Sequence, residues 1–206
     1  MIYFDNSATT KVHPEVLTTY TKVSEAIWGN PSSLHKMGEN AYNLLEQSRA
    51  QIAELLGCQK EEIFFTSGGT EGDNWAIKGT ALEKGIYGKH LITTQVEHPA
   101  VLNSMKQLEK LGFEVTYLPV DENGRVSVEE LKQALRKDTI LVSVMAVNNE
   151  VGTIQPIKEI AQVLADHPKV HFHVDAVQAV GKGLTDLIMD ERVDLVLSLI
   201  HISEPT

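Results

Sequence analysis

The amino-acid sequence predicts an α/β fold, in which a mostly parallel sheet is flanked by helices. Helical and strand-like patterns alternate along nearly the whole chain of 206 residues. The strand-like runs are apolar without alternating polar positions, as expected for strands that are buried on both faces. Parallel strands need a crossover connection, usually a helix, so this alternation favours a parallel sheet. Hydrophobic residues make up 42% of the chain, which is enough to form a core.

The expected elements follow one another in a simple order. Residues 1–14 show no helical pattern and are expected to form an N-terminal arm or loop. Residues 39–56 repeat apolar side chains at spacings of three and four, which predicts a helix, and Gly57 follows at the C-cap position. Further helices are expected to begin near Thr70, Pro99, Val128 and Pro156. Six apolar runs are expected to be strands: 63–66, 90–94, 115–120, 140–147, 170–174 and 193–197.

Composition and charge exclude several classes of protein. The net charge of −10 and the absence of a Lys/Arg-rich run argue against a nucleic-acid partner. No apolar stretch approaches the ~18 residues of a membrane span, and the N-terminus lacks the features of a signal peptide. The single cysteine, Cys58, cannot form an internal disulfide, which suits a reducing compartment. We therefore expect a cytoplasmic protein with no membrane partner.

Ligands of open α/β sheets bind outside the carboxyl ends of the strands, so the residues that follow each strand are the candidates. After the run 63–66, Gly68 and Gly69 allow the backbone to approach a ligand, and the next helix offers its N-terminus to an anion. Thr70 is expected to cap this helix, with Asp73 placed as in a capping box. A plain capped turn would have the same pattern. The glycine fingerprints of dinucleotide and P-loop sites are absent.

Three further positions carry candidate polar side chains. His98 precedes Pro99 at the start of a helix, where an imidazole could stack on an aromatic cofactor, move protons, or simply be solvated. Asn148 and Asn149 follow the run 140–147 and could bond a ligand or shape a turn. Asp175 follows a buried strand, where a carboxylate needs a positive partner. It could cap a helix or pair with a protonated ring nitrogen.

Together these residues match the needs of pyridoxal 5′-phosphate (PLP). Its phosphate requires a helix N-terminus, its ring a flat partner, and its pyridinium nitrogen a carboxylate. Another phosphate-bearing cofactor with a flat ring would compete, as in an unrelated nucleotide-binding α/β protein. His171 and His173 share a strand face and could bind a metal ion. No further ligand stands at the spacing of a metal site, so none is predicted.

Six segments between Tyr3 and Val196 carry a family likeness. In order and separation they resemble cysteine desulfurases of the NifS/IscS type. These are PLP-dependent enzymes of the class V aminotransferase family, so the resemblance implies the large domain of fold type I. The six segments are 5–10, 29–35, 66–71, 97–98, 148–152 and 173–178.

The resemblance implies a role for individual residues. The backbone around Gly69 and the Thr70 side chain would hold the cofactor phosphate. His98 would stack on the ring and act as the catalytic group for proton transfer. Asp175 would pair with the ring nitrogen, and Gln178 would bond the ring hydroxyl oxygen. Asn149 would position the substrate amino acid. The substrate side of the site would be lined by Ala8, Thr9 and residues 30–33.

The resemblance also implies an activity and partners. Such an enzyme removes sulfur from L-cysteine, leaving L-alanine and a persulfide on an active-site cysteine, and the sulfur enters iron–sulfur cluster or thionucleoside biosynthesis. A homodimer is implied, with a sulfur-acceptor or iron–sulfur scaffold protein as partner. Selenocysteine lyase or another class V PLP enzyme is the near alternative. A non-catalytic remnant or scaffold that pairs with a full-length subunit is an alternative of a different kind.

The likeness ends after Val196. The family continues with a Ser-x-His-Lys motif, whereas this chain has His201 at the histidine position and Ile202 at that of the lysine that forms a Schiff base with PLP. We therefore expect residues 15–196 to be an incomplete large domain, and 197–206 to be a foreign or out-of-frame tail. The sulfur-accepting cysteine would lie beyond the chain. Cys58, between a helix end and a strand, is expected to be a packing or surface residue.

Overall fold

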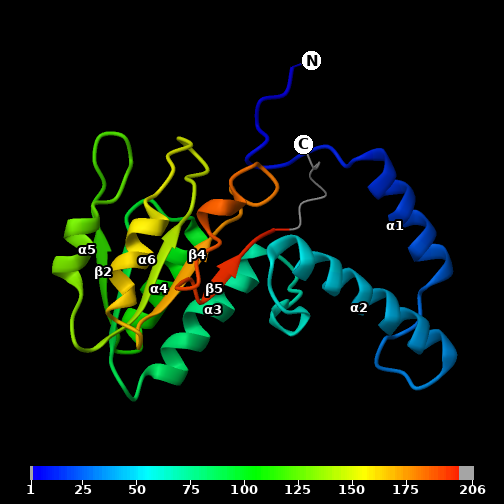
Figure 1. Cartoon of the computed structure of the whole chain (residues 1–206), viewed down its shortest axis with the longest axis horizontal. Helices are drawn as coiled ribbons and strands as arrows, with labels where there is room; N and C mark the ends of the chain where they lie inside the picture. The colour runs from blue at the N-terminus through cyan, green and yellow to red at the C-terminus, as the bar shows by residue number, and fades with distance from the viewer. Residues whose placement is uncertain (1, 200–206) are drawn as a thin grey trace. The chain divides into compact units, whose positions relative to one another are not determined.

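The computed structural model describes residues 2–199, which fall into two compact units, 2–65 and 66–199. Figure 1 shows the chain coloured from its N-terminus to its C-terminus. The tail positions 201 and 202 singled out above lie outside the described residues. The domain limits expected from the sequence stay a prediction.

The first unit consists of α1 (Pro14–Ala26), α2 (Lys36–Leu56) and the short 3-10 helix η1 (Lys60–Glu62). Residues 2–13 contain no helix, as expected. Helix α2 ends at Gly57, whose φ of 65° is left-handed, so the predicted C-cap is confirmed. The apolar stripe of α2 is only partly covered, because Leu55 remains 82% exposed.

The predicted strand over residues 63–66 is wrong. These residues are not paired with any strand of the described chain, and Phe64 is 66% exposed. The carbonyl of Ile63 accepts a hydrogen bond from the Arg49 guanidinium instead of from a neighbouring strand. A backbone carbonyl needs one partner, and here a side chain supplies it.

The second unit is built on a five-stranded sheet in which every neighbouring pair is parallel. This confirms the predicted fold class. The spatial order is β2-β1-β3-β4-β5. The strands are β1 (His90–Thr94), β2 (Glu114–Leu118), β3 (Thr139–Met145), β4 (His171–Asp175) and β5 (Leu195–Leu197).

The helices of the second unit are α3 (Gly69–Lys84), α4 (Pro99–Lys110), α5 (Val128–Ala134) and α6 (Ile157–Ala165), followed by the 3-10 helix η2 (Thr185–Leu187). Helices α3 and α4 contribute to one apolar cluster, and α5 and α6 to the other, so both faces of the sheet are covered. No helix in the described part of the chain has the length and apolar character needed to cross a membrane.

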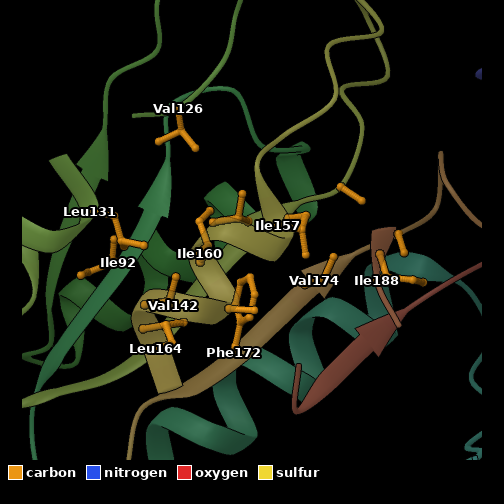
Figure 2. Close-up of a cluster of buried hydrophobic side chains, with 14 of the residues drawn as sticks. Ile92, Val126, Leu131, Val142, Ile157, Ile160, Leu164, Phe172, Val174 and Ile188 are labelled. Carbon is orange, nitrogen blue, oxygen red and sulfur yellow. The ribbon is translucent and has the colours of Figure 1, made fainter. Parts of the chain in front are cut away.

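Alternation along the strands assigns each side chain to one of these clusters. Leu91 of β1 packs in the cluster of α3 and α4. Its neighbour Ile92, with Val142 and Phe172 of the next strands, packs against Ile160 of α6 (Figure 2). Burying one such side chain stabilises the fold by about 1.5–3 kcal/mol.

The strand order creates a topological switch point between β1 and β3. The chain leaves β1 for β2 on one side, and after β2 it crosses back to β3 on the other. The crevice outside the carboxyl ends at such a point is where open α/β sheets bind ligands. The loops that follow β1 and β3, together with the end of β4, therefore form the candidate site.

Candidate functional site

The N-terminus of α3 presents unpaired backbone donors. No residue within 2–199 accepts a hydrogen bond from the backbone N–H of Gly69, Thr70 or Glu71. A Cβ atom built on Gly68 would meet nothing within 4 Å, whereas one built on Gly69 would lie 3.5 Å from the Leu199 side chain. Free N–H groups and the positive end of the helix dipole suit a phosphate group.

The cap of α3 differs from the prediction. Gly68 is the N-cap, and Thr70 lies one position inside the helix, so Thr70 is not the capping residue. The carboxylate of Glu71 reaches back and accepts from the Ser67 N–H at 2.5 Å, a role that the sequence had suggested for Asp73. The exposed Thr70 hydroxyl has no hydrogen-bond partner among the described residues and is available to a ligand.

His98 stands at the start of α4, as predicted. Its Nδ1 accepts a hydrogen bond from the Ala100 N–H at 3.2 Å, and Pro99 occupies the first helical position. An accepting Nδ1 carries no proton, so the proton of the neutral imidazole lies on Nε2. The side chain is exposed. The cap fixes the ring and leaves Nε2 open to a ligand.

Glu97, the residue before this histidine, links β1 to β3. Its Oε1 accepts from the Thr94 hydroxyl at 2.6 Å and from the Met145 N–H at 3.1 Å. Burial raises the pKa of Glu97 to about 8, so the group is a neutral acid at pH 7. Its Oε2 is buried and has no partner among the described residues. Sequence reasoning gave Glu97 no role, because the bond to β3 depends on the sheet order.

The two amide side chains after β3, Asn148 and Asn149, have different roles. Asn148 shapes the turn, because its Oδ1 accepts from the N–H groups of Glu150 and Val151, each at 2.9 Å. Its Nδ2 donates to the Val96 carbonyl at 2.9 Å, a second link across the switch point. Asn149 is half-buried, and within residues 2–199 its side chain bonds only to Glu150, at 3.0 Å. Asn149 is therefore the amide available to a ligand.

Asp175 is the last residue of β4 and is 6% exposed. One oxygen accepts from the Val177 N–H at 3.1 Å, and no cation pairs with the group among the described residues. Burial raises the pKa of Asp175, and the nearby His98 partly opposes this shift. No helix follows, since 177–183 are turns, so the helix-cap reading of Asp175 is wrong. The part of the site formed by residues 2–199 thus lacks the positive group that a buried carboxylate requires.

The remaining predicted residues lie in the turn after β4 and in the first unit. Gln178, in the turn after β4, is half-buried and accepts from the Lys182 ammonium. Ala8 and Thr9 belong to the first unit, where the Thr9 hydroxyl lies 2.6 Å from that of Tyr3. Their assignment to the substrate side, like that of residues 30–33, stays a prediction. Cys58 is half-buried, and burial raises the pKa of its thiol.

No three His, Cys, Asp or Glu side chains group around a possible metal position in residues 2–199. The two histidines of β4 have other surroundings. His173 is fully buried and its Nδ1 lies 2.9 Å from the Ser143 hydroxyl. His171 sits at the start of the strand, where burial lowers its pKa.

Replacing Glu97 tests the link between the two strands. We expect E97A to lower the free energy of unfolding by about 2–4 kcal/mol, because two buried donors lose their acceptor. E97Q keeps an amide oxygen at the same place and is expected to cost less than about 1 kcal/mol. Urea denaturation of both variants measures the difference. Equal losses would mean that the carboxylate charge, not its acceptor oxygen, stabilises the site.

Comparisons with known proteins agree on one family. A family model described as aminotransferase class-V matches residues 2–197. The chain is 63% identical to a NifS/IcsS protein homolog of Lactobacillus delbrueckii subsp. bulgaricus, over 95% of this chain and 51% of the relative. It is 51% identical to cysteine desulfurase IscS of Methanosarcina thermophila, over 87% of this chain and 44% of the relative. The chain thus spans about half the length of the curated relatives it matches.

Solved structures give the same answer. The chain is similar to a NifS-like protein, with a TM-score of 0.91 and 43% identity, over 98% of this chain and 55% of that one. It is also similar to SspA in complex with cysteine, with a TM-score of 0.89 and 37% identity, over 98% of this chain and 58% of that one. At 43% and 37% identity the likeness includes the amino-acid sequence as well as the fold.

Proposed function

This chain belongs to the class V aminotransferase family, and we propose that it supplies the cofactor-binding residues of a PLP-dependent cysteine desulfurase. The observation that carries the proposal is Asp175, a buried carboxyl group that forms no ion pair with a cation within residues 2–199. A protonated ring nitrogen would provide the missing charge. The open N-terminus of α3 in the same unit would take the phosphate of the same cofactor.

Each residue of the site fits one part of PLP. The first-turn N–H groups of α3 and the Thr70 hydroxyl would bind the phosphate. His98 would stack on the ring and hold or move a proton at Nε2, which its cap leaves open. Asp175 would keep the ring nitrogen protonated, and Gln178 would bond the ring hydroxyl oxygen. When bound, PLP supplies an electron sink for the bonds at the substrate α-carbon.

The proposed substrate is L-cysteine, whose sulfur would leave as a persulfide on an enzyme cysteine, with L-alanine as the other product. Support comes from relatives named cysteine desulfurase and from the similar structure described as a complex with cysteine. Asn149 would position the amino acid, with Ala8 and Thr9 on the substrate side. A homodimer and a sulfur-acceptor or iron–sulfur scaffold partner belong to the same proposal. The cofactor residues do not fix the leaving group, so selenocysteine lyase is the near alternative.

One sequence feature favours a second candidate. In an ungapped continuation of the resemblance, Ile202 falls where the family has the lysine that binds PLP covalently, whereas the family match itself covers residues 2–197. A protein that binds PLP without turnover, or that pairs with a full-length subunit, would not need that lysine. The two candidates share the cofactor site and differ in chemistry.

PLP binding by the 206-residue chain tests the proposal. We expect saturable binding, at least about tenfold tighter for PLP than for pyridoxal, because only PLP offers a phosphate to α3. Binding is measured by equilibrium dialysis. Equal affinities, or no saturation, would contradict the assigned phosphate site.

Two further measurements separate the candidates. Borohydride treatment followed by mass spectrometry is expected to find no pyridoxyl group on a lysine of this chain. Alanine and sulfide are then assayed with L-cysteine, PLP and a thiol reductant. Release of both products by the chain alone would reject the non-catalytic candidate.

A further inference from the structure

A column of three buried polar side chains links α3 to the sheet. Asp73 of α3 and His173 of β4 are 1% and 0% exposed, and Ser143 of β3 is also fully buried. The His173 Nδ1 lies 2.9 Å from the Ser143 hydroxyl oxygen. On its other side, Nε2 lies 3.6 Å from Oδ1 of Asp73. Neither of these last two atoms has a hydrogen-bond partner among the described residues.

The surroundings favour neutral forms of both groups. Burial, together with the charges of Asp175 and Glu97, raises the pKa of Asp73 to about 8. Burial lowers the pKa of His173 to about 4. At neutral pH Asp73 therefore carries a proton and His173 does not. An approach of about half an ångström would give an ordinary O–H···N hydrogen bond between them.

The column connects the two ends of the proposed cofactor site. Asp73 lies one helical turn after Thr70, on the helix that would bind the phosphate. His173 lies two residues before Asp175 on the same face of β4. Around them the contact between α3 and the sheet is apolar, since Leu197 of β5 packs against Gly72. Apolar packing is not directional, whereas a hydrogen bond fixes an orientation.

We propose that Asp73 and His173 form a neutral hydrogen-bonded pair that positions the first turns of α3 relative to Asp175. The Asp73 carboxylic acid donates to Nε2 of His173, and Nδ1–H of His173 donates to the Ser143 oxygen. Both residues act as positioning residues, because neither is placed against the cofactor. The inference rests on the proposed function only where PLP affinity is the readout.

Substitutions of Asp73 test the pair in the 206-residue chain. Asparagine retains a neutral donor, so D73N is expected to bind PLP within about threefold of the unsubstituted chain. D73A leaves Nε2 of His173 without a partner and is expected to weaken PLP binding about tenfold or more. Thr80→Ala is the matched control, because it removes another buried polar side chain of α3 far from the helix N-terminus. It is expected to leave PLP affinity unchanged.

Two readouts do not depend on PLP. In NMR spectra, the His173 ring is expected to carry its proton on Nδ1 and not to titrate between about pH 5 and pH 7. Amide exchange in the first turns of α3 is expected to be faster in D73A and unchanged in D73N. If D73A does not fold, the pair is tested by the tautomer of His173 and by amide exchange in D73N.

Several outcomes would overturn the pair. They are a D73N variant as impaired as D73A, a D73A variant with normal affinity and exchange, or a His173 ring protonated at Nε2. If the unsubstituted chain does not bind PLP, the proposed function fails, and the pair is judged by exchange and tautomer alone.

Discussion

The Asp175→Asn variant is expected to be more stable than the unsubstituted chain without cofactor and to bind PLP more weakly. Asparagine keeps an oxygen for the Val177 N–H and removes a buried charge that has no cation in the described chain. We expect a gain on the order of 1 kcal/mol in the free energy of unfolding at neutral pH. A charge-assisted bond to a ring nitrogen is worth about 1.5–3 kcal/mol, so PLP affinity should fall about 10- to 100-fold.

Opposite changes in stability and affinity would distinguish a binding residue from a structural one. Urea denaturation gives the first quantity and a PLP titration the second. Glu122→Gln is the matched control, because it neutralises an exposed carboxylate in a turn and should change neither. A variant that lost stability and affinity together would show that Asp175 mainly holds the fold. Unchanged affinity would remove Asp175 from the cofactor site.

The strands were predictable where burial on both faces made them continuously apolar. The run 90–94 coincides with β1, and four other runs match strands within a few residues. The run 63–66 was equally apolar but has no partner strand in the described chain. A strand depends on its neighbour as well as on its own residues, and that neighbour cannot be read from the local pattern.

The site was predictable only in part, for a similar reason. His98 and Asp175 could be found because they lie at, or within four residues of, the carboxyl end of a strand. The positioning roles of Asp73 and Glu97 could not, since each depends on a strand remote in sequence. The cap of α3 was misplaced because Gly68 and Thr70 are both acceptable N-cap residues, and only the backbone distinguishes them.

We expect the chain to lose stability as the pH rises above neutrality, because it contains two buried acids, Asp73 and Glu97. Burial raises the pKa of Asp73 and of Glu97 from ordinary values of 3.8 and 4.5 to about 8. Between those values each group is protonated in the folded chain and ionised in the unfolded chain. Folding then binds protons, so stability falls by about 1.4 kcal/mol per pH unit for each group. The stability that the two protonated acids contribute is fully present below about pH 4 and is lost as the pH rises towards 8.

Buried histidines change stability with pH in the opposite direction, so they determine the pH range in which the effect of the acids can be measured. His173 has a pKa of about 4 when folded and an ordinary value of 6.5, so it destabilises the fold as pH falls from 6.5 towards 4. The pKa values of His90 and His171 are lowered in the same direction. Below pH 6.5 these histidines offset the acids. Above it the two acids dominate, and we expect a loss of a few kcal/mol between about pH 6.5 and pH 8.

Urea denaturation at several pH values across this window measures the slope, and the double variant D73N/E97Q tests its cause. Both substitutions keep neutral hydrogen-bonding groups but cannot ionise, so the slope should become much shallower, with Asp175 as the remaining acid whose pKa is raised by burial. Glu122→Gln should leave it unchanged. A steep slope that persisted in the double variant would assign the pH dependence to other groups. Stability that rose between pH 6.5 and pH 8 would mean that Asp73 and Glu97 are ionised in the folded chain, and the neutral pair with His173 could not then form.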